Sequence, residues 1–191
     1  MNRTSLSTAL ALALVTGLAS NAGAQSGPGD DLVSGQLSQA GTSVEWGTAR
    51  GVVDEPIEEV MGVIEDYANY AAFLPHFAAS RVLSQRGSAA MVYVEVNVMR
   101  NSATLWAQLR IRPRANRGDT RVIEATMTDG NVDLFHALWE VTPVDAGHTM
   151  VEFRILVDPD LPLPASVFTG ENVKAARRTI RALRRRVAVV A

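Results

Sequence analysis

The chain contains no cysteine, and this absence removes several kinds of chemistry at once. Without a thiol there is no cysteine nucleophile, no thiolate metal ligand and no disulfide. The three histidines, His76, His136 and His148, show no metal-ligand spacing, and the sequence has no H-E-x-x-H, G-x-S-x-G, phosphate-loop or dinucleotide-binding glycine motif. The sequence therefore predicts no metal site, no cofactor and no catalytic residues.

An excess of charge of one sign is also missing. The 18 basic and 20 acidic residues give a formal net charge of −2 at pH 7, so nothing global favours nucleic acid as a partner. The apolar run 9–19 is too short to span a bilayer. A basic start, Met1–Arg3, precedes it, and the small residues Ala22–Ala24 follow it. We interpret residues 1–24 as a signal peptide cleaved after Ala24, which predicts a periplasmic or secreted protein.

The remaining chain divides into a lead-in and one domain. Residues 25–42 lack apolar periodicity and are predicted to form a flexible lead-in. Residues 43–191 suit a single domain, because about 150 residues bury ~70% of the surface that the unfolded chain exposes. Since no disulfide is possible, the stability of this domain must come from its hydrophobic core.

The clearest local pattern opens this domain. Val44–Arg50 alternates between apolar and polar residues as a strand does, and Asp54 is the predicted N-cap of a helix with Pro56 in its first turn. Apolar residues then recur at i, i+3, i+4 and i+7 within Ile57–Ile64, which predicts an amphipathic helix. A second, short helix is expected to end before Pro75, because proline disfavours helical geometry in the preceding residue.

Beyond Pro75 the period changes from 3.6 to 2, and tight turns recur. In Met91–Met99 four valines share one face of a predicted strand. Consecutive short strands of this kind predict an antiparallel meander, to be followed by one helix from Ala165 to the C-terminus. The apolar stripe of that helix comprises Val173, Ala176, Ile180, Leu183 and Val187. A curved sheet of seven strands around one long helix would leave a cavity for an apolar molecule.

Several of these features together resemble a known superfamily. They are the turn Asp54–Pro56, the helix Val60–Tyr70, the stop Phe73–Pro75, the segment Trp139–Pro143, the strand Val151–Phe153 and the closing helix. Their order and spacing are similar to the START-like superfamily, which includes polyketide cyclases/dehydrases, coenzyme-Q-binding START proteins and pollen allergens. The resemblance implies an α+β helix-grip fold with two short helices after the first strand, and a hydrophobic small molecule as ligand.

The candidate ligand-binding residues come from the short second helix, the proline stop and the predicted inner faces. The aromatic residues among them can line a pocket or simply pack on the sheet, since large aromatics bury ~150–250 Å² in either role. His76 lies at the predicted cavity mouth, where it can hydrogen-bond a ligand or move a proton, or be a half-exposed loop residue. The candidates are Tyr70, Phe73, Leu74, His76, Phe77, Val94, Val96, Trp139, Phe153, Ala176 and Ile180.

The closing helix carries seven basic residues from Lys174 to Arg186 with no acidic residue between them. Such a face can dock on anionic lipid headgroups, at ~1 kcal/mol for each charge near the surface. It can equally be a solvated face whose cations complement the C-terminal end of the helix dipole. The membrane-docking candidates are Arg177, Arg178, Arg181 and Arg185.

Three functions are compatible with this sequence. The leading hypothesis is an exported carrier that binds, and in that way transports, a lipid, sterol or isoprenoid in the cavity. An enzyme of the cyclase/aromatase type would need polar groups inside the cavity, whereas the predicted inner faces are almost wholly apolar. A register error of one residue would place Glu95 and Asn97 inside instead. The third possibility is a protein-interaction module that uses the sheet surface.

Overall fold

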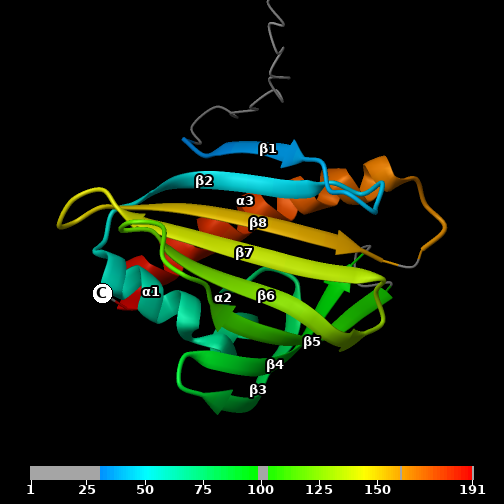
Figure 1. Cartoon of the computed structure of the whole chain (residues 1–191), viewed down its shortest axis with the longest axis horizontal. Helices are drawn as coiled ribbons and strands as arrows, with labels where there is room; N and C mark the ends of the chain where they lie inside the picture. Colours follow the sequence, from blue (N-terminus) through cyan, green and yellow to red (C-terminus); the bar gives the residue numbers. More distant parts are fainter. Residues whose placement is uncertain (1–30, 99–102, 160, 191) are drawn as a thin grey trace, which may run out of the picture.

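The computed structural model of the protein describes residues 31–98, 103–159 and 161–190. Within them an antiparallel sheet curves around one long helix, and two short helices follow the second strand (Figure 1). The elements are β1 (Val33–Leu37), β2 (Trp46–Val53), α1 (Ile57–Glu65), a 3-10 turn (Tyr67–Asn69), α2 (Tyr70–Phe73), β3 (Phe77–Arg86), β4 (Ala89–Val98), β5 (Ala103–Pro113), β6 (Arg121–Gly130), β7 (Leu134–Pro143), β8 (Thr149–Asp158) and α3 (Ala165–Val190). The predicted α+β helix-grip architecture is confirmed.

The sheet has eight strands, in the order β1-β2-β8-β7-β6-β5-β4-β3, so the predicted number of seven is wrong. The additional strand, β1, lies in the segment 25–42 that was predicted to be flexible. It pairs with β2 from Val33 opposite Arg50 to Leu37 opposite Trp46, and the preceding Leu32 is fully buried. Backbone pairing and one anchoring leucine therefore order residues that lack an apolar pattern. The predicted signal peptide, residues 1–24, lies outside the described residues.

The helix α1 begins differently from the prediction. Pro56, and not Asp54, occupies the N-cap position, and no side chain caps the helix. The carbonyl of Pro56 instead accepts the backbone N–H groups of Glu59 and Val60, at 3.1 and 3.2 Å. The neighbouring Glu55 carbonyl accepts a hydrogen bond from Thr149, which is fully buried in β8. The fixed backbone angle of proline and this tertiary contact thus replace the side-chain cap.

The inner face of the sheet follows the predicted alternation. In β4, Val92 and Val94 are 0% and 2% exposed, whereas Tyr93 and Glu95 lie on the outer face and hydrogen-bond each other. The register error that would have placed Glu95 inside is therefore absent. Most of the core lies between this inner face, α1 and the C-terminal half of α3.

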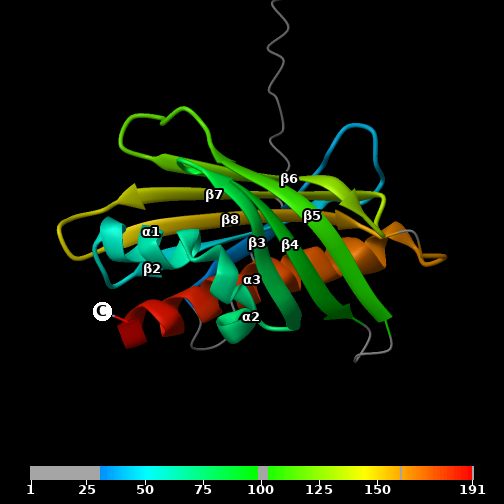
Figure 2. The ribbon, with the colours of Figure 1, turned by 90° about the horizontal axis from the view of Figure 1, so that it is seen from below.

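The helix α3 packs along β2 and β8 rather than across the whole sheet (Figure 2). Its predicted stripe is confirmed at four of five positions: Ala176, Ile180, Leu183 and Val187 are at most 1% exposed, and Val173 is half-buried. Among the described residues, no helix combines the length and apolar character needed to cross a membrane.

The helix α3 approaches the sheet closely at Gly47 of β2. A Cβ atom on this glycine would lie 2.0 Å from the carbonyl carbon of Asn172 in α3. The side chain of Asn172 fixes the same contact, because its amide donates to the carbonyls of Glu45 and Val157 at 3.1 and 3.2 Å. The point where α3 crosses β2 is therefore fixed by two features. Gly47 has no side chain to keep the helix away, and the buried amide of Asn172 is fully hydrogen-bonded.

Candidate functional site

An apolar cavity of about 570 Å³ lies between α3 and the far half of the sheet. Because α3 is seated on β2 and β8, the curving sheet separates from the other side of the helix along β4 and β5. The proline-rich connection from β8 to α3 closes one end. The apolar lining consists of Pro75, Phe77, Val94, Val96, Val98, Leu105, Ala107, Val132, Phe135, Ile155, Val157, Pro159, Leu161, Leu163, Val167, Phe168 and Ala175.

The candidate ligand-binding residues fall into two groups. Four of them, His76, Phe77, Val94 and Val96, line this cavity together. The other seven do not line it, and they pack in or against the core; they are Tyr70, Phe73, Leu74, Trp139, Phe153, Ala176 and Ile180. Contact with a ligand stays a prediction for all eleven residues.

Several lining residues were not among the sequence candidates. On α3 the cavity is lined by Phe168, Ala175 and Thr179. Ala175 and Thr179 each precede a residue of the buried stripe and therefore lie beside that stripe on the helix surface. Phe135 and Ile155 contribute from β7 and β8. Their apolar spacing was visible in the sequence, but no local pattern distinguishes a side chain that faces a cavity from one that faces packed atoms.

Four polar lining residues are exposed or half-buried, and we call the part of the cavity that they line its mouth; they are His76, Glu171, Arg178 and Thr179. His76 is exposed and has a backbone φ of 69°, a left-handed conformation that is uncommon for a residue other than glycine. Its carbonyl accepts the backbone N–H of Asn97 at 2.8 Å, which holds the loop against β4. On α3, the guanidinium of Arg178 lies 3.9 Å from the carboxylate of Glu171, and Thr179 lies beside them in the lining. A ligand with one polar end can meet hydrogen-bonding groups here.

The aromatic cluster beside the mouth is part of the packing. The ring of Tyr70 makes edge-to-face contacts with Tyr67, Phe73 and Phe77, with centroids 5.8, 5.8 and 6.1 Å away. Its hydroxyl donates to the carbonyl of Ile64 at the end of α1. Tyr70 therefore ties the two short helices to the start of β3, next to Phe77 of the lining.

Burial changes the acidity of these phenols. Desolvation, with a smaller effect from the nearby Glu65 carboxylate, raises the pKa of Tyr67 to about 12. Desolvation also raises the pKa of Tyr70 well above its usual value. In Tyr93 the hydrogen bond to Glu95 is the largest cause of a raised pKa. A raised pKa favours the neutral phenol in the folded state.

We expect all three tyrosines to resist ionisation in the native protein. Phenolate absorbance should stay low as the pH rises past the ordinary tyrosine pKa of 10.0, whereas protein unfolded in urea should titrate near that value. The stability that comes from the neutral phenols is full below pH 10 and is lost as the pH rises through the native pKa values. Coincident titration of folded and unfolded protein would contradict the packing described for Tyr67 and Tyr70.

The basic residues of α3 do not form one open face. Arg177, Arg178 and Arg181 are half-buried, and Arg185 is exposed. The guanidinium of Arg184 donates to the Asp31 carboxylate at 2.6 and 3.0 Å and so ties the helix to the segment before β1. Docking of the helix on an anionic membrane stays a prediction.

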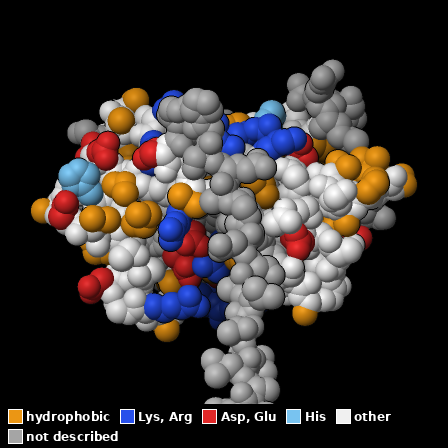
Figure 3. Space-filling view, turned by 90° about the horizontal axis from the view of Figure 1, so that it is seen from above, with side chains coloured by type: hydrophobic (Ala, Val, Ile, Leu, Met, Phe, Trp, Pro, Cys, Tyr) orange, Lys and Arg blue, Asp and Glu red, His pale blue; other side chains and the backbone are white. Residues whose placement is uncertain are grey.

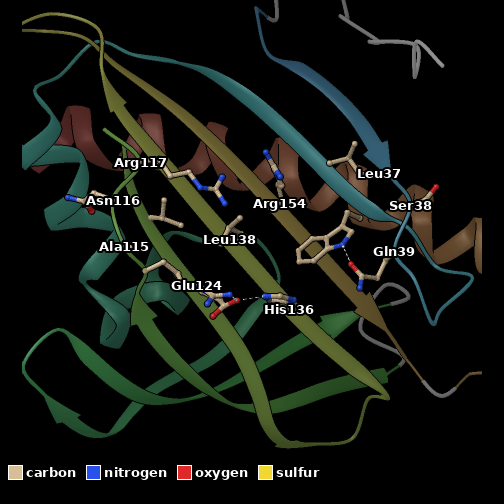
Figure 4. A pocket seen from close by; sticks show the side chains of 13 residues that line it. Leu37, Ser38, Gln39, Ala115, Asn116, Arg117, Glu124, His136, Leu138 and Arg154 are labelled. Atoms are coloured by element: carbon tan, nitrogen blue, oxygen red, sulfur yellow. Dashed lines mark hydrogen bonds and ion pairs between the residues drawn. The ribbon is translucent and has the colours of Figure 1, made fainter. Parts of the chain in front are cut away.

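A second hollow, of about 690 Å³, lies on the outer face of the sheet (Figure 4). Its floor is formed by outward-facing residues of β6, β7 and β8, and its walls are the segments 37–39 and 114–117. Charged and polar side chains line it beside apolar ones, in contrast to the mostly apolar cavity beside α3. We assign binding of an apolar ligand to the inner cavity because its lining matches that chemistry, although the outer groove has the larger volume.

The carboxylate of Glu124 is the most unusual group in this outer groove, because it is 3% exposed on a sheet face that borders solvent. Arg114 donates to it at 2.8 Å, Arg112 at 3.3 and 3.4 Å, and His136 lies 3.1 Å away. Burial alone would raise the pKa of Glu124, but His136 and the two arginines outweigh it and lower the pKa. Glu124 is therefore ionised, and both of its carboxylate oxygens contact the side chains of Arg112, Arg114 and His136. Within the described residues, no group of three or more acidic or histidine side chains is arranged to hold a metal ion.

Solved structures share this fold at low sequence identity. A STAR-related lipid transfer protein from Xanthomonas axonopodis superposes with a TM-score of 0.72 at 15% identity, over 86% of this chain and 97% of its own. Human StAR-related lipid transfer protein 5 gives a TM-score of 0.69 at 12% identity, over 83% of each chain. An aromatase/cyclase from Streptomyces sp. R1128 gives 0.55 at 16% identity, over 75% of this chain and 93% of its own.

These likenesses establish the fold and leave the function open, since lipid-transfer proteins and a cyclase share it. No curated protein matches the sequence. The sequence profile of the family described as "Polyketide cyclase / dehydrase and lipid transport" matches residues 53–184, which include most of the sheet and most of α3. The chain belongs to this family.

Proposed function

We propose that the protein is an exported carrier that binds one hydrophobic small molecule, a lipid, sterol or isoprenoid, in the cavity beside α3. The observation that carries the proposal is a partly open cavity of about 570 Å³ with a mostly apolar lining. Transfer of apolar ligand surface from water into it is worth ~25 cal/mol per Å², before the cost of association is subtracted.

The volume limits the size of the ligand. About 570 Å³ lies within the range of ~300–1,000 Å³ that is typical of small-molecule pockets. The groups at the mouth, His76, Thr179 and the Glu171–Arg178 pair, would receive a polar end, so we propose an amphipathic ligand with its apolar body inward.

The alternative function is catalysis of the cyclase/aromatase type in the same cavity. General acid–base catalysis requires a titratable group within hydrogen-bonding reach of the reacting atoms. The titratable lining groups are His76, Glu171 and Arg178, all at the mouth. Asn97 and Trp106 also contribute to the lining, but the Asn97 amide accepts a hydrogen bond from Thr104, and the Trp106 ring stacks on Tyr93 of the outer face. This distribution favours binding over catalysis.

Native mass spectrometry tests the proposal. Protein purified under non-denaturing conditions from its own host should carry one lipid-soluble molecule per chain, and organic extraction should release it. Extracted protein should then take up an apolar fluorescent dye that the extracted molecule displaces. Protein that carries nothing and binds no dye would contradict the proposal.

Export is a separate part of the proposal and has its own test. It is supported by the basic start, the short apolar run and the small residues before Gln25 in the sequence. N-terminal analysis of the native protein should find that it begins at Gln25 or within a few residues of it. Retention of Met1 would contradict export by this route and would leave ligand binding untouched.

A further inference from the structure

The outer groove is formed by paired strands of the sheet and by two flanking segments of the chain. Across its floor, Arg154 of β8, Leu138 of β7 and Glu124 of β6 stand side by side on paired strands (Figure 4). The segment 37–39 forms one wall and the loop 114–117 the other. The groove lies on the opposite face of the sheet from the ligand cavity, because the alternate residues of β7, Ala137 and Trp139, point into the core.

The groove contains three arginines, each of which is ion-paired with a carboxylate. Arg114 pairs with Glu124, Arg117 with Glu140, and Arg154 with Glu140 and Glu152. Within the described part of the chain, the side chain of Arg114 donates one hydrogen bond, to Glu124, and the side chain of Arg117 donates one, to Glu140. A guanidinium carries five N–H donors, so both of these side chains retain donors for a ligand. Arg114 and Arg117 are 53% and 71% exposed.

Burial of Glu124 accounts for the fixed position of its neighbours. Removal of a carboxylate from water is unfavourable unless its partners compensate, and a solvated strand position would avoid this cost. Here the ionised Glu124 holds Arg112, Arg114 and His136 around itself. The result is a preorganised edge of guanidinium groups, which lowers the entropic cost of binding an anion.

The end of the groove near β2 offers an aromatic wall. The rings of Trp46 and His136 lie 4.7 Å apart at an angle of 58°, and Gln39 accepts a hydrogen bond from the Trp46 indole at 2.8 Å. Together with Leu37 and Leu138, these rings give an apolar surface close to the arginines. A flat body can rest on this surface while an attached oxyanion reaches the guanidinium groups.

We propose that this groove is a second binding site, for a small organic oxyanion with an aromatic or other flat body. Arg114 and Arg117 bind the oxyanion, Glu124 positions Arg114, and Trp46 with His136 contacts the flat body. This site goes beyond the carrier function proposed for the inner cavity and does not depend on it.

Phenyl phosphate serves as the probe, with binding followed by calorimetry and by the NMR signal of the Trp46 indole N–H. The double substitution Arg114→Gln/Arg117→Gln should weaken binding at least about tenfold, which corresponds to ~1.4 kcal/mol. Binding should also weaken as salt rises from 0.1 M toward 1 M and the Debye length falls from ~10 to ~3 Å. Inorganic phosphate should bind more weakly than phenyl phosphate, because it cannot contact the rings.

Two control variants isolate the groove. Arg110→Gln removes the same charge from an exposed outward position of β5 outside the groove, so it should leave binding unchanged. Ala175→Trp, which fills the inner cavity, should also leave it unchanged. If the double variant unfolds, Arg117→Gln alone, at the more exposed arginine, should still weaken binding.

Several results would overturn the proposal. The first is that phenyl phosphate does not bind at low salt. The second is that the double variant binds it as tightly as the unchanged protein does, and the third is that Ala175→Trp loses binding. Equal affinity for phenyl phosphate and inorganic phosphate would overturn the assignment of a flat body. None of these results affects the carrier proposal, which rests on dye binding and on the co-purified molecule.

Discussion

Substitution of Gly47 by alanine is expected to destabilise the protein by at least about 3 kcal/mol, a larger effect than at any other glycine among the described residues. The new Cβ would lie 2.0 to 2.2 Å from three backbone atoms of Asn172 and Val173. Overpacking of a core costs typically 1–3 kcal/mol, and more where the obstacle cannot rotate away. Backbone atoms inside α3 cannot do so, hence the helix must leave the sheet. Thermal unfolding should show the midpoint lowered by about 6–12 °C.

Gly62 provides the matched control. It lies on the exposed side of α1, and a Cβ there would meet no atom within 4 Å. Because glycine is unfavourable inside helices by roughly 0.5–1 kcal/mol, Gly62→Ala should stabilise the protein by about that amount. Equal stability of Gly47→Ala and the unchanged protein would show that α3 does not cross β2 at this point.

The periodic parts of the fold were predictable because each residue's environment follows from its neighbours in sequence. The buried stripe of α3 and the inner face of β4 were both predicted from spacing alone. The strand β1 was missed, because its only fully buried neighbour is Leu32 and its sequence, VSGQL, has no clear alternation. Its order comes from pairing with β2, which a local pattern does not contain.

The position of the cavity depends on long-range geometry. Both the buried and the cavity-facing sides of α3 carry small and apolar residues, such as Ala176 and Ala175. Which side meets packed atoms is decided where α3 crosses the sheet, at Gly47 and Asn172. A glycine inside a strand does signal a close approach of another segment, but the sequence does not identify that segment.

The exposure of the surface charges also depends on long-range contacts that the sequence pattern does not contain. The basic run of α3 predicted an open cationic face, yet side-chain packing and the pair with Asp31 occupy much of it. Figure 3 shows acidic and basic side chains mixed on the face seen from above, with hydrophobic side chains toward both ends. Leu163, which precedes α3, and Val167 in its first turn are exposed apolar residues that also line the cavity.

Filling of the cavity from α3 should abolish ligand uptake without unfolding the protein. Ala175 is half-buried and its side chain faces the space of about 570 Å³, so an indole at this position can occupy the volume that a ligand needs. We expect Ala175→Trp to weaken binding of an apolar dye at least about tenfold. Its stability should stay within about 1 kcal/mol, since the lower helix propensity of tryptophan is offset by newly buried apolar surface.

The adjacent alanine provides the comparison, because its side chain is fully buried against packed atoms of the core. Ala176→Trp should cost about 1–3 kcal/mol or more through overpacking, while the molecules that remain folded should still bind the dye. Dye titrations and urea unfolding of both variants separate the two environments. If Ala175→Trp instead retained dye binding and lost stability as Ala176→Trp does, the space beside α3 would be filled core. The carrier proposal would then be rejected.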